Sequence, residues 1–193
     1  GDVIRIRPGV YAEELVITGP GAILEPTAPG QGTVVLDGGR AGRVLDVQGP
    51  ARVRLERLTL RGGFAGKGAG IRATDCLLEI LDCEFIDNEV DGTALFPEGA
   101  GLWASGCDLI ISGTTFCDHV EGGALALTDC RMLLDDCTVR NNARFSTVFG
   151  PASGLTMTDC WALIRDSLFT LNGMSSGESV PALGGALQAI GGG

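Results

Sequence analysis

The chain has 193 residues and a formal net charge of −10, and its 14 Lys and Arg residues are scattered singly. This length suits a single domain, residues 1–193, and the charge excludes the basic footprint expected for nucleic acid or an anionic membrane surface. No uninterrupted apolar run approaches the roughly 20 residues of a membrane-spanning helix, and 31 Gly residues favour frequent turns over long helices.

Residues 1–63 carry a degenerate form of a repeat that becomes regular later in the chain. In "VRLERLTLRGG", Leu58, Leu60 and Gly63 stand at the positions that Cys83, Phe85 and Asn88 occupy in the next copy. The repeat therefore extends upstream of its clearest copies, and we expect degenerate coils over 1–63.

Residues 68–193 contain the regular repeats. Four segments share one motif, and "GGALQA" opens a fifth copy that is cut off; the four are "GAGIRATDC" (68–76), "GAGLWASGC" (99–107), "GGALALTDC" (122–130) and "ASGLTMTDC" (152–160). The shortest spacing between copies, about 23 residues, is what one three-sided coil requires. Longer copies carry their extra residues after the Asn that ends the motif, as expected for loops on one face of a solenoid.

Within each copy the apolar residues alternate with polar ones. Ile71 and Ala73, then Leu78 and Ile80, are two apart, which is the period of short strands rather than of helices. The sequence therefore predicts an all-β, right-handed parallel β-helix of about 6–7 coils. The ending "QAIGGG" resembles the middle of a unit, so we expect a fragment of a longer solenoid or a mature piece.

Stacked coils would place equivalent residues in columns along the solenoid. One predicted column holds an Asn in every regular copy except one, where it is His; its members are Asn88, His119, Asn142 and Asn172. Asn at a tight corner can bond to its own turn and to the next coil, and a neutral His can both donate and accept. The cluster Cys117, Asp118, His119 has the residue types of a metal or thiol site, but neighbouring strand side chains point to opposite faces. No metal, cofactor or catalytic residue is predicted.

The seven Cys residues include no C-x-x-C pair, which disfavours a zinc module. Four of them are predicted to stack as a small, apolar, buried column: Cys76, Cys107, Cys130 and Cys160. Whether these thiols are free or form disulfides stays open.

Two columns of acidic residues are the best candidates for enzymatic chemistry. One holds Asp82, Asp136 and Asp166, and the other holds Asp75, Asp129 and Asp159. Carboxylates one coil apart would lie near the roughly 5 Å separation of retaining glycosidases, although Asp before a corner also caps turn amides. A lyase would need a basic side chain in a groove, and Lys67, Arg72, Arg144 and Arg165 share no column with one another.

Aromatic residues are the candidates for ligand binding. Trp103 is predicted to point outward from a strand and Trp161 to lie just past a corner, where an indole can serve as a platform for a sugar. Phe96, Phe145 and Phe149 lie in the long loops. They either pack together or form an apolar interaction patch.

The paired signatures "GGAL" and "F-x-x-N" resemble the repeats of the chlamydial polymorphic membrane proteins and related bacterial right-handed β-helix proteins. The opening "GDVIRIRPGVYAEELVI", followed by "VVLDGG", is similar to the first coils of pectin-lyase-like β-helices. The resemblance implies export to a bacterial surface or the periplasm. It says little about activity, because this architecture carries adhesins, lyases, glycosidases and plain stalks.

Two classes of function follow as expectations. The first is a cell-surface or secreted structural or adhesion module that presents loops to proteins or glycans, with other coils or subunits of a larger assembly as partners. The second is a carbohydrate-active enzyme, a polysaccharide lyase or glycoside hydrolase, that uses the stacked Asp residues.

Overall fold

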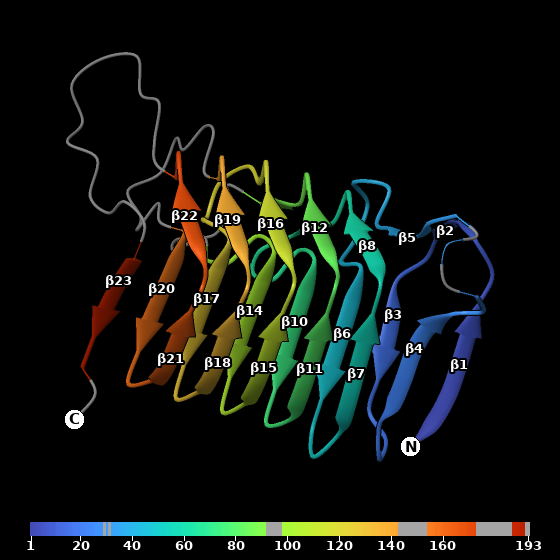
Figure 1. Ribbon diagram of the computed structural model, residues 1–193, viewed down its shortest axis with the longest axis horizontal. Coiled ribbons are helices and arrows are strands. Elements are labelled where there is room, and N and C mark those ends of the chain that lie inside the picture. Colours follow the sequence, from blue (N-terminus) through green and yellow to red (C-terminus); the bar gives the residue numbers. More distant parts are fainter. Residues whose placement is uncertain (29, 31, 92–97, 143–153, 173–186, 192–193) are drawn as a thin grey trace.

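The computed structural model describes residues 1–28, 30, 32–91, 98–142, 154–172 and 187–191. Over these residues the protein is a right-handed parallel β-helix, in which three sheets of seven strands wind around one core (Figure 1). The all-β prediction and the predicted solenoid are confirmed. In this part of the chain, no helix is long and apolar enough to cross a membrane.

Each coil contributes one strand to each of the three sheets. Sheet 1 contains β1 (Asp2–Ile6), β4 (Ala22–Pro26), β7 (Arg52–Glu56), β11 (Leu77–Leu81), β15 (Asp108–Ser112), β18 (Arg131–Asp135) and β21 (Trp161–Arg165). Sheet 2 contains β3 (Leu15–Ile17), β6 (Leu45–Gln48), β10 (Ile71–Thr74), β14 (Leu102–Ser105), β17 (Leu125–Thr128), β20 (Leu155–Thr158) and β23 (Leu187–Ile190). Sheet 3 contains β2 (Gly9–Ala12), β5 (Val34–Asp37), β8 (Leu58–Arg61), β12 (Glu84–Ile86), β16 (Thr115–Cys117), β19 (Thr138–Arg140) and β22 (Leu168–Thr170). A fourth, short pairing joins β9 (Phe64–Ala65) to β13 (Glu89–Val90).

The strands pair in the register that the repeat predicts. Ile71 has Leu45 and Leu102 as its partners in the adjacent coils, and Phe85 has Leu60 and Phe116. Equivalent residues of successive copies therefore stack at the interstrand spacing of about 4.8 Å.

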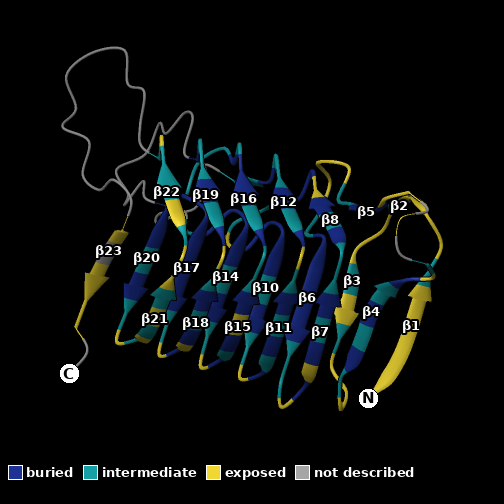
Figure 2. Ribbon diagram, viewed as in Figure 1, coloured by how far each residue is buried: buried dark blue, intermediate teal, exposed yellow. Residues whose placement is uncertain are grey.

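The core lies inside the coils and consists of the side chains that point inward, which are every second residue of a strand. In β11 and β18 the second and fourth residues are buried while the others are partly or fully exposed. Figure 2 shows these buried positions in dark blue along the central strands. Phe85 and Phe116 are fully buried and stack with ring centroids 4.6 Å apart, which contributes about 0.5–1.5 kcal/mol beyond the area that they bury.

The corners require backbone in the left-handed region, and this accounts for the acidic columns. Asp75, Asp82, Asp129 and Asp136 all have φ between 51° and 52°. Asp, Asn and Gly tolerate this conformation better than other residues, and Gly106 occupies the same corner with φ of 66°. The Asp residues are therefore selected at these positions by backbone geometry.

The predicted Asn column lies at the corner that follows sheet 3, and hydrogen bonds between successive coils stabilise it. We call it the Asn ladder; its members are Asn88, His119, Asn142 and Asn172. The backbone N–H of Asn88 donates to Nδ1 of His119 over 3.2 Å, and the N–H of His119 donates to Oδ1 of Asn142 over 3.2 Å. The N–H of Asn142 donates to Oδ1 of Asn172 in the same way. The predicted ladder is confirmed, and His119 takes the accepting role of an Asn.

His119 fails to reproduce the donating role. The side-chain amides of Asn88 and Asn142 donate to the carbonyl oxygens of Leu60 and Phe116, each over 3.1 Å. The ring nitrogen Nε2 of His119 is buried and has no hydrogen-bond partner among the described residues. A buried donor left unpaired costs about 1–3 kcal/mol.

Glycines of the repeat motif pack directly against the Asn ladder. The Gly-rich start of a copy and the Asn near its end are therefore in contact. A Cβ on Gly63 would lie 3.0 Å from Oδ1 of Asn88, and one on Gly101 would lie 2.6 Å from Nε2 of His119. A Cβ on Gly70 would collide with the carbonyl oxygen of Gly101. The Gly-rich motif and the terminal Asn are therefore neighbours in space, and each constrains the other.

The predicted cysteine column is present and its thiols are free; Cys76, Cys107 and Cys130 are buried, whereas Cys160 is only partly buried. Sγ of Cys76 lies 3.5 Å from Sγ of Cys107, and the N–H groups of Cys107 and Cys130 point to Sγ of the next Cys in the column. Burial raises the pKa of Cys83, in a second column, to about 12, so this thiol stays neutral and packs as a small apolar group.

Candidate functional site

The cluster of Cys117, Asp118 and His119 does not converge on one point. His119 faces the core, whereas Asp118 forms an ion pair with Arg140 (3.6 Å) and accepts a hydrogen bond from Asn141. Burial raises the pKa of the Cys117 thiol to about 12. The predicted separation holds for His119, but Cys117 and Asp118 interact with one another, and the nearby Asp118 also contributes to the raised pKa of the thiol.

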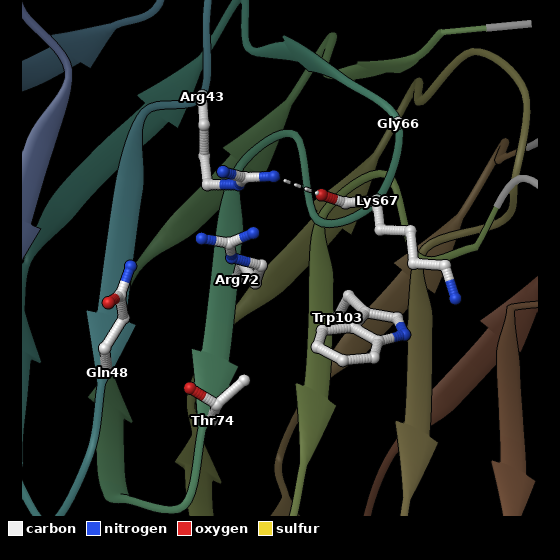
Figure 3. Close-up of a pocket in the computed structure, with 7 residues that line it drawn as sticks. All are labelled: Arg43, Gln48, Gly66, Lys67, Arg72, Thr74 and Trp103. Carbon is white, nitrogen blue, oxygen red and sulfur yellow. Dashed lines mark hydrogen bonds between the residues drawn. The ribbon is translucent and has the colours of Figure 1, made fainter. Parts of the chain in front are cut away.

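Within the described part of the chain, a groove of about 710 Å³ on the outer face of sheet 2 is the strongest candidate for a binding site. In Figure 3, Arg43, Gln48, Thr74 and Trp103 lie around Arg72. Gln48, Arg72, Thr74 and Trp103 project from β6, β10 and β14, so a rigid sheet forms the floor. Gly66 and Lys67 belong to the segment that precedes β10 and form a wall.

Arg43 attaches this wall to the sheet. Its Nε donates to the carbonyl oxygen of Gly68 over 2.9 Å, and its Nη2 donates to that of Lys67, also over 2.9 Å (Figure 3). Burial lowers the pKa of Arg43, and the nearby charge of Arg72 acts in the same direction. The guanidinium of Arg43 thus has a structural role before any ligand binds.

The charges at the floor of the groove are largely paired with one another. Arg72 Nε donates to Oδ1 of Asp46 over 3.0 Å, and Arg72 Nη2 donates to Oδ2. Burial would raise the pKa of Asp46, but hydrogen bonds from Arg72 and Gln48 outweigh it and hold the pKa below the usual value. The floor therefore carries a fixed ion pair, and Nη1 of Arg43 lies 3.8 Å from Oδ2 of the same Asp46, so the groove has only a small excess of positive charge.

Trp103 is held in place on two sides. Its indole Nε1 donates to Glu98 over 3.1 Å, and Nζ of Lys67 lies 5.2 Å from the centre of its ring and 3.1 Å from the same carboxylate. A cation over an indole contributes about 0.5–1 kcal/mol at an exposed site. The ring is half-buried and is oriented before any ligand arrives.

The other aromatic candidates do not join this groove. Trp161 lies on β21 in sheet 1 and is 61% exposed, next to Arg131 of the preceding coil. Phe96, Phe145 and Phe149 lie outside the described residues, as does Arg144. The structure thus separates the two tryptophans that the sequence grouped as binding residues.

Part of one acidic column lines a second, smaller recess of about 330 Å³. Asp75 and Asp129 lie two coils apart with Gly106 between them, and Asp108 and Arg131 lie beside them. Arg131 donates through Nε and Nη2 to Asp108, each over 2.7 Å. The cation nearest the acidic column is therefore already bound to a carboxylate.

Sequence reasoning missed four residues that line the groove, Arg43, Gln48, Gly66 and Thr74, and also Asp46, which pairs with Arg72. It also set Lys67 and Arg72 aside because they share no column. The structure brings these two together, because the segment before β10 folds over the outer face of the sheet.

No protein-family model, curated protein or solved structure matches this chain. The resemblance to surface β-helix proteins therefore rests on the repeat motifs alone, and the function has to be inferred from the geometry of the site.

Proposed function

We propose that the protein is an extracellular or cell-surface adhesion module and that the groove on sheet 2 binds a glycan. The groove around Trp103 is the observation that supports this proposal. An indole offers a flat apolar surface to the C–H face of a pyranose ring. Thr74 on the adjacent strand adds a hydroxyl, and Gln48 on the strand beyond it adds an amide. Such polar groups fix the orientation of a sugar in binding sites.

The electrostatics favour an uncharged or weakly charged sugar. Arg72 is paired with Asp46, and Lys67 is paired with Glu98. A polyanion would have to displace these carboxylates, whereas hydroxyl groups can accept from the N–H groups that the ion pairs leave unused. A surface location agrees with the export that the resemblance to bacterial β-helix proteins implies.

The proposal predicts that Trp103→Ala weakens glycan binding about 10- to 100-fold, because the stacking surface is removed. Trp161→Ala is the matched control and should change the affinity by less than about twofold, since Trp161 lies on a different sheet. The ligand would first be selected on a glycan array, and the affinities measured by isothermal titration calorimetry. Circular dichroism would confirm that both variants are folded.

Salt dependence tests the chemistry of the ligand in the same experiment. For a neutral glycan, the affinity should be nearly the same at low and at high salt, since few free charges are screened. A steep loss of affinity with salt, or equal losses in the two Trp variants, would count against this groove as a neutral-sugar site.

Cleavage of a glycan is the alternative, and the recess beside Asp75 and Asp129 is the observation that favours it. Carboxylates two coils apart lie near the upper end of the separation of about 6.5–9.5 Å in inverting glycosidases. Turnover assays on polyuronides and on the array hits would test it. Activity that disappears in a folded Asp129→Asn variant would replace the adhesion proposal with an enzymatic one.

A further inference from the structure

The outer face of sheet 1 carries an apolar column that nothing in the described part of the chain covers. The first, third and fifth residues of β7, β11, β15, β18 and β21 form three outward columns, since residues two and four point to the core. In the central column, Ile110 is 39% and Leu163 is 43% exposed, with Leu133 between them. Such an exposed patch marks an interaction surface more often than chance.

The two columns on either side of the central one carry complementary residues in each coil. The column of first residues reads Arg52, Leu77, Asp108, Arg131 and Trp161. The column of fifth residues reads Glu56, Leu81, Ser112, Asp135 and Arg165. Each position in one column has a chemical complement at the same level in the other.

A two-fold axis parallel to the solenoid would bring these two columns together. Rotation about that axis keeps every coil at its own level but reverses the direction of its strands. Two copies placed face to face in this way set the first residue of each strand opposite the fifth residue of the same strand in the second copy. The third residue then faces its own counterpart, as in any isologous interface.

This arrangement matches the charges along the face. Arg131 would oppose Asp135 of the second copy, and Arg52 would oppose Glu56. The central pair has bonding capacity to spare: Arg131 uses Nε and Nη2 on Asp108 and keeps Nη1, and Asp135 receives Arg165 on Oδ2 and keeps Oδ1. Glu56 already accepts from Arg54 and Arg57, one on each oxygen, so the contact with Arg52 adds less.

The apolar and aromatic positions match as well. Leu77 would oppose Leu81 of the second copy, and Trp161 would oppose Arg165, a pairing that permits a cation–π contact. At the centre, Ile110, Leu133 and Leu163 would each face their own counterpart. In the two remaining coils Arg54 and Glu79 would face themselves, but they are adjacent in the column and can pair diagonally.

We propose that the protein forms a symmetric dimer through the outer face of sheet 1, with the two-fold axis parallel to the solenoid. The five matched strands, each of about five residues and spaced by about 4.8 Å, offer a face of about 400 Å² per copy. The total of about 800 Å² lies in the range of weak, transient interfaces. The dimer is therefore expected to dissociate in the micromolar range.

A charge-reversal experiment on the whole chain tests both the dimer and its geometry. Arg131→Asp would oppose Asp135 of the second copy with like charge, and Asp135→Arg would oppose Arg131 in the same way. Each variant alone should dimerise at least about 100-fold more weakly, since facing like charges costs several kcal/mol. An equimolar mixture of the two variants should recover the dimer, because both contacts are then between opposite charges.

Sedimentation velocity over a concentration series measures this directly. Arg140→Asp is the matched control: it removes an exposed Arg of the same coil from its pair with Asp118, but on sheet 3, and should dimerise like the wild type. A wild type that stays monomeric up to about 500 µM, single variants that still dimerise, or a mixture that stays monomeric would each overturn the proposal. A two-fold axis along the strands would instead set Arg131 opposite Asp108 and Asp135 opposite Ser112. In that case Asp135→Arg alone would still dimerise, whereas Arg131→Asp would not.

Discussion

Replacing His119 with Asn is expected to raise the stability of the solenoid, and the gain should grow as the pH falls from 7 towards 3. At neutral pH, the Asn side chain can accept from the N–H of Asn88, as His119 does, and can also donate to the carbonyl oxygen of Phe85. The unpaired Nε2 disappears. The gain at pH 7 should be about 1–3 kcal/mol.

The additional gain in acid comes from the titration of the imidazole. Burial lowers the pKa of His119 to about 3, against an ordinary value of 6.5, and the nearby Asp118 offsets this only in part. Between these two values the unfolded chain binds a proton that the folded chain excludes, so the wild type loses stability as the pH falls below 6.5 and stops losing it below about 3. At about 1.4 kcal/mol per pKa unit, the full loss is at most about 5 kcal/mol.

Urea unfolding of the wild type and of His119→Asn at several pH values between 3 and 8 would measure this difference. The carboxylates titrate in both proteins, so the difference between the two curves isolates His119. His119→Ala serves as the control: it also removes the titration but leaves the N–H of Asn88 unpaired, so it should be less stable than Asn at every pH. A stability difference that stays constant with pH would contradict the buried neutral imidazole.

Gly70→Ala is expected to destabilise the protein by about 3 kcal/mol or more, the upper end of the cost of overpacking. The new methyl group would collide with the carbonyl oxygen of Gly101 in the next coil and lie 3.3 Å from Nδ2 of Asn88. A backbone carbonyl cannot move aside as a flexible side chain can, and this one accepts a hydrogen bond from Ile71 over 2.9 Å.

Gly66→Ala provides the comparison from the same segment, because a Cβ there meets nothing within 4 Å. Thermal melts should show Gly66→Ala close to the wild type and Gly70→Ala lowered by about 6–12 °C, given a shift of about 2–4 °C per kcal/mol for a chain of this size. Equal melting temperatures for the two variants would show that the coils are not packed this closely at the ladder.

The sequence predicted the register of the solenoid well, because the physical cause of a column is local. A corner that needs left-handed backbone favours Asp, Asn or Gly in every coil, and an inward position needs an apolar side chain in every coil. His119 could be recognised as a substitute for Asn on this basis. The reason for the acidic columns was harder to infer. An Asp that takes part in catalysis and an Asp that only adopts the left-handed backbone of a corner look identical in the sequence.

The groove could not be predicted in the same way, because it depends on residues that do not repeat. Lys67 and Glu98 lie between the regular strands, and nothing in their spacing indicates that both lie against Trp103. Asp46 belongs to a degenerate coil in which the motif is weak. Contacts made by irregular segments follow from the path of the chain, which a repeat pattern does not specify.

The in-register stacking of coils also determines how such a chain can change its length. Because each coil presents the same pattern of bonds on both of its edges, the deletion of residues 99–121 would remove one copy and bring "GGALALTDC" beneath the coil that now precedes it. Asn88 would then lie next to Asn142, and the core column would close over the gap. Length changes within the strands are therefore expected to be accommodated only in whole turns of the solenoid, whereas the corner after the Asn can also take partial insertions as loops. A change of a few residues within a strand would disturb every level that follows it.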